Sequence, residues 1–159
     1  MLRIKTIEIS NRNEGEIERA IRNYSLKRHT PPDFIRSYTY IPRENKYFLA
    51  KESEDMIEFT RIRLPLEMFL PKVIVFVSKE NWKRLQIYLG VFTSSILVLL
   101  LLTFILNLYY WIFLGENRLE ITLGVSLLLG FIYLLTIIQV KLTLKSLKKA
   151  LSISKKVEN

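Results

Sequence analysis

The chain of 159 residues contains no cysteine, one histidine and only five glycines. Without cysteine it forms no disulfide, and it has no thiol nucleophile and no thiolate ligand for a metal. Gly15 is the only glycine outside two apolar runs and the loop between them, which excludes a glycine-rich phosphate loop. His29 stands alone in KRHTPP, so no set of base, nucleophile and orienting group can be assembled around it. We therefore expect a non-enzyme without a cofactor.

Acidic residues gather in two short segments, but neither has the pattern of a metal site. Glu14 and Glu16 fall where a helix begins, a position that favours acids because of the helix dipole. The segment KESED has the composition of a solvated turn. No histidine or cysteine joins either group, and no EF-hand spacing is present. We expect no metal ion.

Charge is missing from two long segments, residues 85–115 and residues 121–140. Each reaches the roughly 20 apolar residues that cross a hydrocarbon core about 30 Å thick. A buried helix of a soluble protein would keep a polar stripe, and neither segment has one. The sequence therefore predicts a transmembrane hairpin. Its expected parts are a first helix at 79–114 with a cytoplasmic extension, a short outer loop at 115–120 and a second helix at 121–140.

The charges outside the hairpin predict its orientation. Residues 141–159 carry six lysines and one glutamate, and residues 1–84 also carry an excess of basic residues. Basic residues beside membrane helices are retained on the cytoplasmic side. We expect both termini in the cytoplasm, in the cytoplasmic membrane of a bacterium, with anionic lipids of the inner leaflet as a partner. The residues expected at the lipid interface are Trp82, Lys83, Arg84, Trp111, Lys141, Lys145, Lys148 and Lys149.

Residues 1–78 have the pattern of a small cytoplasmic α+β domain. LRIKTIEIS predicts a strand whose apolar positions change parity midway, which a bulge or burial of both faces would explain. A helix follows, with Ile17, Ala20 and Ile21 on one face. FIRSYTYI, NKYFLAKE, MIEFTRIRL and KVIVFV predict four more strands, although KVIVFV also fits an interfacial membrane segment. The expected order is β-α-β-β-β-β, with the sheet packed on one helix.

Two helical segments are expected beside the membrane spans. Ser78 has the residue type of an N-cap for a helix through ENWKRLQIY, which would continue into the first span. Residues 141–159 predict a basic amphipathic cytoplasmic helix, with Leu144, Leu147 and Leu151 on one stripe. That stripe needs a surface, either the bilayer interface or the protein's own domain. Lysines beside a span serve topology and anionic lipids first, so we do not expect nucleic acid as a partner.

Small and polar residues within the spans predict how the helices pack. Close approach and hydrogen bonding between helices favour such residues. In an antiparallel hairpin Asn107 would lie level with Ser126, and Gln139 with Ser94 or Ser95. The alternative is that Asn107 faces a neighbouring protomer or another subunit. The residues expected in intramembrane helix packing are Gly90, Ser94, Asn107, Ser126, Gly130 and Gln139.

Two of the predicted strands combine basic and aromatic residues. Alternation places Arg36, Tyr38 and Tyr40 on one face of the first, and Arg61 and Arg63 on one face of the second. If the two strands are neighbours, this face could bind a nucleotide, anionic head groups or an acidic partner. The alternative is that the tyrosines belong to the core and the arginines to a solvated edge.

Three functions remain open, the last of them a peripheral lipid-handling or membrane-shaping protein that uses the basic tail. The first is an accessory or structural subunit of a membrane assembly, as a homo-oligomer or with other membrane proteins, which works on the cytoplasmic side. The second is a sensor and effector whose domain binds a nucleotide or another anionic signal and whose hairpins oligomerise to perturb the membrane. That second layout is similar to the coarse layout of some bacterial antiviral effectors. The spans contain no ionisable side chain, which argues against a transporter acting alone.

Overall fold

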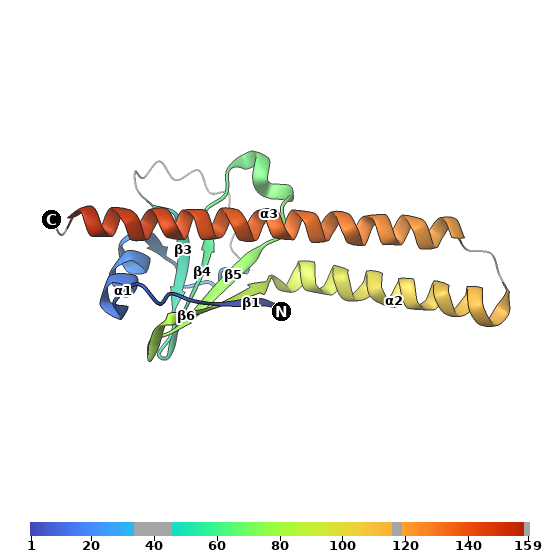
Figure 1. Cartoon of the computed structure of the whole chain (residues 1–159), viewed down its shortest axis with the longest axis horizontal. Coiled ribbons are helices and arrows are strands. Elements are labelled where there is room, and N and C mark those ends of the chain that lie inside the picture. The colour runs from blue at the N-terminus through green and yellow to red at the C-terminus, as the bar shows by residue number, and fades with distance from the viewer. Residues whose placement is uncertain (34–45, 116–118, 158–159) are drawn as a thin grey trace.

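The computed structural model describes residues 1–33, 46–115 and 119–157, and in these ranges the chain forms a mixed six-stranded sheet, three α-helices and one 3-10 helix (Figure 1). The elements are β1 (Arg3–Glu8), α1 (Glu14–Asn23), β2 (Ser25–Lys27), β3 (Phe48–Glu52), β4 (Met56–Arg61), η1 (Pro65–Phe69), β5 (Val73–Ser78), β6 (Asn81–Leu89), α2 (Val91–Leu114) and α3 (Leu119–Val157). The α+β fold class predicted from the sequence is confirmed.

The strands lie in the order β1-β6-β5-β4-β3-β2, and every neighbouring pair is antiparallel except β2 and β3. The register of β1 on β6 shifts between Arg3 and Lys5, which fits a bulge, one of the two explanations left open by the sequence. KVIVFV is strand β5 in the interior of the sheet, so its interfacial alternative is wrong. The short strand β2 was not predicted, and the predicted strand FIRSYTYI lies outside the described residues.

The helix predicted through ENWKRLQIY is wrong, because this segment is strand β6. Ser78 does accept a hydrogen bond, from the backbone N–H of Glu80 at 3.2 Å, but within a tight turn that connects β5 to β6. Leu85, Ile87 and Leu89 alternate along β6 and are buried. This alternation fits a half-buried strand. The first apolar helix therefore begins at Val91, twelve residues later than the predicted start at 79.

One face of the sheet is covered by two helices, α1 and the C-terminal half of α3, and not by the single helix predicted (Figure 1). Ile17 and Ile21 of α1 and Leu147 and Ala150 of α3 are all at most 5 % exposed. From the sheet, the buried side chains that complete this core include Phe48, Phe59, Val75, Val77, Leu85 and Ile87.

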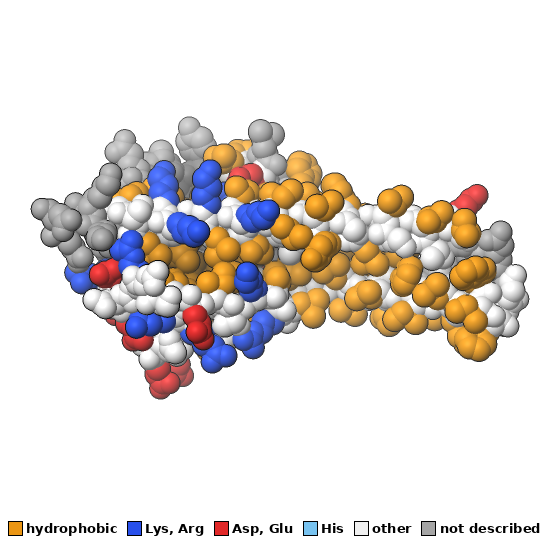
Figure 2. Space-filling model, in the orientation of Figure 1, with side chains coloured by type: hydrophobic (Ala, Val, Ile, Leu, Met, Phe, Trp, Pro, Cys, Tyr) orange, Lys and Arg blue, Asp and Glu red, His pale blue; other side chains and the backbone are white. Residues whose placement is uncertain are grey.

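The helices α2 and α3 form an antiparallel hairpin that projects from the sheet domain (Figure 1). Each is long and apolar enough to cross a membrane. Few of the side chains in their apolar windows are buried within the chain, 11 % in α2 and 6 % in α3. Figure 2 shows hydrophobic side chains along the projecting hairpin, whereas basic and acidic side chains gather over the sheet domain. This distribution is compatible with membrane insertion.

The predicted second span and the predicted basic tail are one element, since α3 runs unbroken for 39 residues. Its first half lies beside α2, and its second half crosses the face of the sheet (Figure 1). The leucine stripe of the tail therefore covers the protein's own domain, which decides between the two surfaces left open by the sequence.

Candidate functional site at the junction of the sheet domain and the hairpin

The sheet meets the hairpin where three strands end or begin on the same side. The pairing of Val73 with Leu89 places the start of β5 beside the end of β6, and Val91 then opens α2. Thr60, at the end of β4, donates a hydrogen bond from Oγ1 to the carbonyl oxygen of Val73 at 2.8 Å. The junction therefore collects residues that follow β4, precede β5 and begin α2.

The first polar cluster at the junction joins β4, η1 and α3. Arg61 Nη2 lies 2.7 Å from Glu67 Oε2 and donates to Gln139 Oε1 at 3.2 Å. Glu67 also accepts a hydrogen bond from the backbone N–H of Leu64 at 2.9 Å. Arg61 is 8 % exposed and Gln139 is fully buried. A buried charge is costly unless it is paired and hydrogen-bonded, and Glu67 supplies this pairing.

The second polar cluster surrounds Arg63, which is 7 % exposed. Its guanidinium donates to the carbonyl oxygens of Leu70 at 2.7 Å and Pro71 at 2.9 Å. Its Nε is buried and has no hydrogen-bond partner among the described residues. Burial, and next the nearby charge of Arg61, lower the pKa of Arg63 to about 10. No carboxylate forms an ion pair with Arg63 in the described part of the chain, so this charge is only partly compensated.

Lys72 and Asp33 lie beside Arg63, at the N-terminus of α2. Lys72 Nζ donates to the carbonyl oxygen of Asp33 at 2.6 Å, and Asp33 Oδ2 accepts from the backbone N–H of Val91 at 2.8 Å. Asp33 thus caps α2 from a distant part of the chain, and its charge is favourable at the positive end of the helix dipole. Burial lowers the pKa of Lys72 to about 8, although the charge of Asp33 opposes this shift.

Gly90 allows this close packing. Its backbone N–H donates to the carbonyl oxygen of Lys72 at 2.8 Å. A Cβ at Gly90 would lie 2.5 Å from Asp33 Oδ1 and 3.2 Å from Lys72 Cβ. Any larger residue would therefore push the capping carboxylate away from α2. Gly90 was predicted to allow close helix packing in the membrane, and in the structure it allows close packing at the helix N-terminus instead.

A cavity of about 320 Å³ opens at the junction. Its polar end is lined by Arg63, Lys72 and Asp33. Its apolar wall comes from the end of η1 and the residues after it, the first turns of α2 and the middle of α3. The apolar lining residues are Phe69, Leu70, Pro71, Phe92, Ile96, Ile132 and Leu135. The cavity thus combines two cations with side chains of both helices that could span the membrane.

The predicted anion-binding sheet face is not formed by Arg61 and Arg63. Both side chains are buried at the junction, where Arg61 bonds to Glu67 and Arg63 bonds to backbone carbonyls. Alternation failed here because Arg63 lies beyond the end of β4. The other members of the predicted face, Arg36, Tyr38 and Tyr40, lie outside the described residues.

The residues predicted for helix packing have different positions in the hairpin. Ser94 and Asn107 are both 6 % exposed. Ser94 accepts from the backbone N–H of Leu2 at 3.0 Å, which connects the start of α2 to the N-terminal strand and not to Gln139. Asn107 donates to the carbonyl oxygen of Thr103 at 2.8 Å within its own helix. It is buried against the rest of the chain, and contact with another protomer stays a prediction.

The predicted pairs across the hairpin are absent from the described hydrogen bonds. Ser126 is exposed and donates to the carbonyl oxygen of Thr122 at 2.8 Å, not to Asn107. Gly130 is also exposed, and a Cβ there would meet nothing within 4 Å. Gln139 bonds to Arg61 of the sheet. The two polar residues therefore form hydrogen bonds in different regions. Asn107 bonds within the hairpin, and Gln139 bonds at the junction.

Several residues predicted at the lipid interface belong to the sheet domain. Trp82 is 5 % exposed in the core, under the guanidinium of Arg22 at 5.7 Å from the ring centroid. Lys83 and Arg84 lie on β6, roughly 20 Å before α2 at about 3.3 Å per residue, so they do not flank the first span. The remaining residues are exposed on the helices: Trp111, Lys141, Lys145, Lys148 and Lys149. Lys149 lies over the ring of Tyr47 at 5.1 Å.

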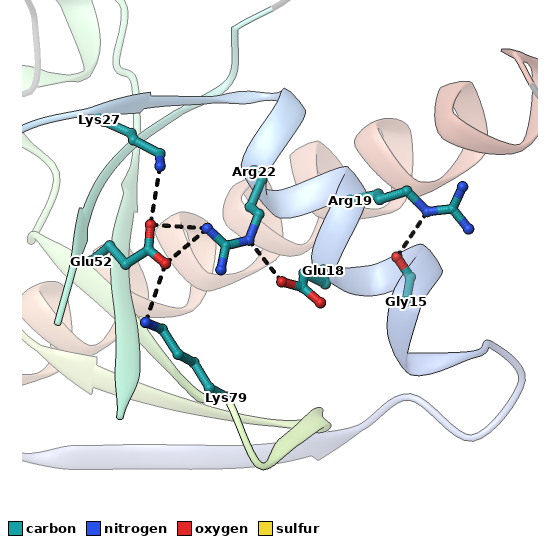
Figure 3. A network of polar contacts seen from close by, with 7 residues as sticks. All are labelled: Gly15, Glu18, Arg19, Arg22, Lys27, Glu52 and Lys79. Atoms are coloured by element: carbon teal, nitrogen blue, oxygen red, sulfur yellow. Dashed lines mark hydrogen bonds and ion pairs between the residues drawn. The ribbon is translucent and has the colours of Figure 1, made fainter. Parts of the chain in front are cut away.

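Glu52, which belongs to the segment KESED and is the last residue of β3, is the centre of an ion-pair network that the sequence did not predict (Figure 3). Glu52 lies 2.8 Å from Arg22, 3.1 Å from Lys27 and 3.2 Å from Lys79. Burial alone would raise the pKa of Glu52, but hydrogen bonds from Lys27, Lys79 and Arg22 lower it to about 2. Through these contacts Glu52, in β3, forms ion pairs with α1, β2 and the turn before β6. In the described ranges no three His, Cys, Asp or Glu side chains form a possible metal site.

A comparison of the chain with protein-family models, with curated proteins and with solved structures gives no match. The class of protein is therefore defined by the fold and the junction alone. It is a small α+β domain carried on a hairpin of two long apolar helices.

Sequence reasoning missed Asp33, Glu67 and Lys72, three of the junction residues. Each is separated from its partners by a strand or a turn, and its own neighbours in the sequence carry no recognisable motif. The prolines that flank them, in TPPD, LPLE and LPKV, are the only local signal, because proline ends strands and helices. Contacts between distant segments require the topology of the sheet.

Proposed function

We propose that the chain is a non-enzymatic, two-pass membrane protein that serves as an accessory or structural subunit of a membrane assembly. Its sheet domain and both termini face the cytoplasm, and its working surface lies there. The observation that carries this proposal is the continuity of α3 from the apolar hairpin into the core of the sheet domain. A domain that shares a rigid helix with a membrane span is held at a fixed height and orientation over the membrane.

Two further observations support membrane insertion with this orientation. Large hydrophobic side chains along the hairpin remain exposed in the isolated chain, among them Leu127 at 75 % and Phe113 at 70 %. Water would disfavour such a surface, whereas lipid or another subunit would cover it. The lysines of residues 141–149 are exposed on α3 directly after its apolar first half. Basic residues beside a membrane span favour the cytoplasmic side.

Topology is the first test. A reporter that is active only in the cytoplasm, fused after Asn159 of the full chain, should be active in cells, and the complementary periplasmic reporter should be inactive. A fusion placed at residue 117, in the predicted outer loop, should give the opposite result. An active periplasmic reporter after Asn159 would contradict the proposed orientation.

The role as a subunit is tested by purification in mild detergent followed by mass spectrometry. The proposal expects a homo-oligomer or a complex with other membrane proteins at fixed stoichiometry. A stable monomer without any partner would overturn it.

A sensor and effector remains the second candidate, because the unbroken α3 would transmit a shift of the sheet domain to the hairpin. An open depression of about 580 Å³ on the face of the sheet opposite α1 and α3, lined in part by Phe76, Arg84 and Tyr88, offers a place for a signal. Permeabilisation of vesicles by the reconstituted protein on addition of a nucleotide would favour this candidate over the first. Intact vesicles under the same conditions would favour the first.

A further inference from the structure

We propose that the cavity at the junction binds the phosphodiester head group of an anionic membrane lipid, with one acyl chain along α2 and α3. This inference rests on the proposed membrane insertion. It assigns a specific lipid-binding site, formed by named residues of the cavity, to the protein. This goes beyond the general attraction of a basic surface to an anionic leaflet.

The charges around the cavity match a phosphodiester. Arg63 and Lys72 line its polar end together with Asp33, and the neighbouring pair of Arg61 and Glu67 is neutral as a unit. Among the described residues that line the cavity, two cations and one carboxylate leave a net charge of one positive unit. A phosphodiester carries one negative charge and accepts the charge-assisted hydrogen bonds that arginine and lysine donate.

The buried guanidinium provides an independent indication of an anion. Arg63 is 7 % exposed, its terminal nitrogens bond to two carbonyl oxygens, and no carboxylate forms an ion pair with it in the described part of the chain. A buried charge without a counterion is costly, and a bound anion would supply one. Burial also lowers the pKa of Lys72 to about 8, a cost that a bound anion would offset.

The apolar wall of the cavity identifies a lipid rather than a free phosphate. Phe92 and Ile96 belong to the first turns of α2, and Ile132 and Leu135 lie on α3 before Lys141. These side chains fall at the end of both apolar segments that is nearest the sheet, where a lipid head group would meet the protein. Phe69 and Phe92 at the cavity are 78 % and 77 % exposed, so the wall opens towards the surroundings of the hairpin.

The test uses the full chain, purified in a nonionic detergent and offered phosphatidylglycerol or phosphatidylcholine in equal amounts. Native mass spectrometry counts the lipid molecules retained by each protein. We expect one retained phosphatidylglycerol per chain and at least tenfold less phosphatidylcholine. Equal retention of the two lipids would overturn the proposal.

Three substitutions separate this site from general electrostatics. Lys72→Met should reduce the retained phosphatidylglycerol at least fivefold. Ile132→Trp, which fills the apolar wall without changing any charge, should do the same. The matched control Lys141→Met removes an exposed lysine of α3 outside the cavity and should change retention less than twofold. A loss as large for Lys141→Met as for Lys72→Met, or no loss for Ile132→Trp, would contradict the site.

Two additional measurements make each result interpretable. Circular dichroism and the unfolding temperature show whether each variant is folded. For a variant that does not fold, Lys72→Gln and Ile132→Phe replace the original pair. Addition of 10 mM inorganic phosphate, in roughly the excess that saturates weak anion sites, should leave the lipid bound. Displacement by phosphate would assign the site to a free anion and overturn the lipid proposal.

Failure of this proposal can be distinguished from failure of the proposed function. A chain that extracts from membranes with alkaline carbonate is not an integral membrane protein, which would overturn both. A chain that resists extraction but retains neither lipid overturns the lipid site alone.

Discussion

The two halves of α3 differ in how much of their apolar surface is buried within the chain. The half beside α2 leaves most of it exposed, and the half over the sheet buries it. In the first half Leu127 is 75 % exposed and Leu134 is 59 % exposed. In the second half Leu147 is 5 % exposed and Ala150 is fully buried. The first half has no polar stripe and depends on its surroundings for cover, whereas the second half has one apolar stripe that the sheet covers. Gln139, bonded to Arg61, marks the boundary between them.

This difference shows how one helix can belong to two environments. Apolar side chains all around a helix suit lipid, and a single stripe opposite charged residues suits the surface of a domain. The sequence changes from one pattern to the other at Lys141, but the backbone does not break there. A rigid connection between hairpin and domain follows, and the predictions below test the two halves against each other.

The largest expected effect is on a leucine of the second half. Leu147→Ala should lower the free energy of unfolding by about 2–5 kcal/mol, because it leaves a cavity between α3 and the sheet. The matched Leu134→Ala should cost less than about 1 kcal/mol, since lipid or detergent contacts that side chain in both folded and unfolded states. Chemical unfolding in detergent, followed by the fluorescence of the buried Trp82 in a Trp111→Phe background, measures both. Equal losses would contradict the comparison.

The next effect concerns the ion pair at the boundary. Glu67→Gln should cost about 1–3 kcal/mol, because it leaves the buried guanidinium of Arg61 without a charged partner. Glu80→Gln provides the control at an exposed acid of the turn between β5 and β6 and should stay within about 0.5 kcal/mol of the parent. The same unfolding experiment applies. No difference between the two variants would mean that the junction does not contribute to stability.

A smaller effect is expected from the ion-pair network of the sheet domain, through its pH dependence. The pKa of Glu52 is lowered from 4.5 to about 2 in the folded protein. Its stabilising contribution is therefore complete above pH 4.5 and decreases as the pH falls towards 2. The difference in unfolding temperature between the parent and Glu52→Gln should be largest at neutral pH and shrink between pH 4.5 and pH 3. A difference that does not change with pH would contradict the role of this charge.

The smallest effect is expected within the hairpin. Asn107→Leu removes a side chain that bonds to its own helix and whose Oδ1 is buried without a partner among the described residues. The free energy of unfolding should change by less than about 0.6 kcal/mol, a typical value for a polar side chain in a membrane helix. Oligomer size, measured by light scattering in detergent, should stay the same. Dissociation of the oligomer would show that Asn107 contacts another chain after all.

Much of the fold could be predicted from local patterns. Two uncharged segments longer than a bilayer crossing have few low-energy environments, so their helices were located correctly, apart from the start of the first. The strands β1, β3, β4 and β5 also follow from short runs rich in β-branched, aromatic or apolar residues, and the helix α1 follows from helical spacing. The candidate site could not be predicted in this way, because Asp33, Arg63 and Lys72 meet only after β4, β5 and β6 have paired.

The sequence by itself determined that this protein has two apolar helices beside an α+β domain, since the absence of charge and the spacing of apolar residues act over a few turns. Only the tertiary structure decided the secondary structure of one segment and the packing surface of another. Residues 81–89 became a strand because β1 and β5 supply its hydrogen-bond partners on both sides. The stripe of Leu144, Leu147 and Leu151 covers the sheet rather than the bilayer, because the straight α3 passes directly over that face. Both outcomes depend on which surfaces are available as partners, and a local pattern does not contain that information.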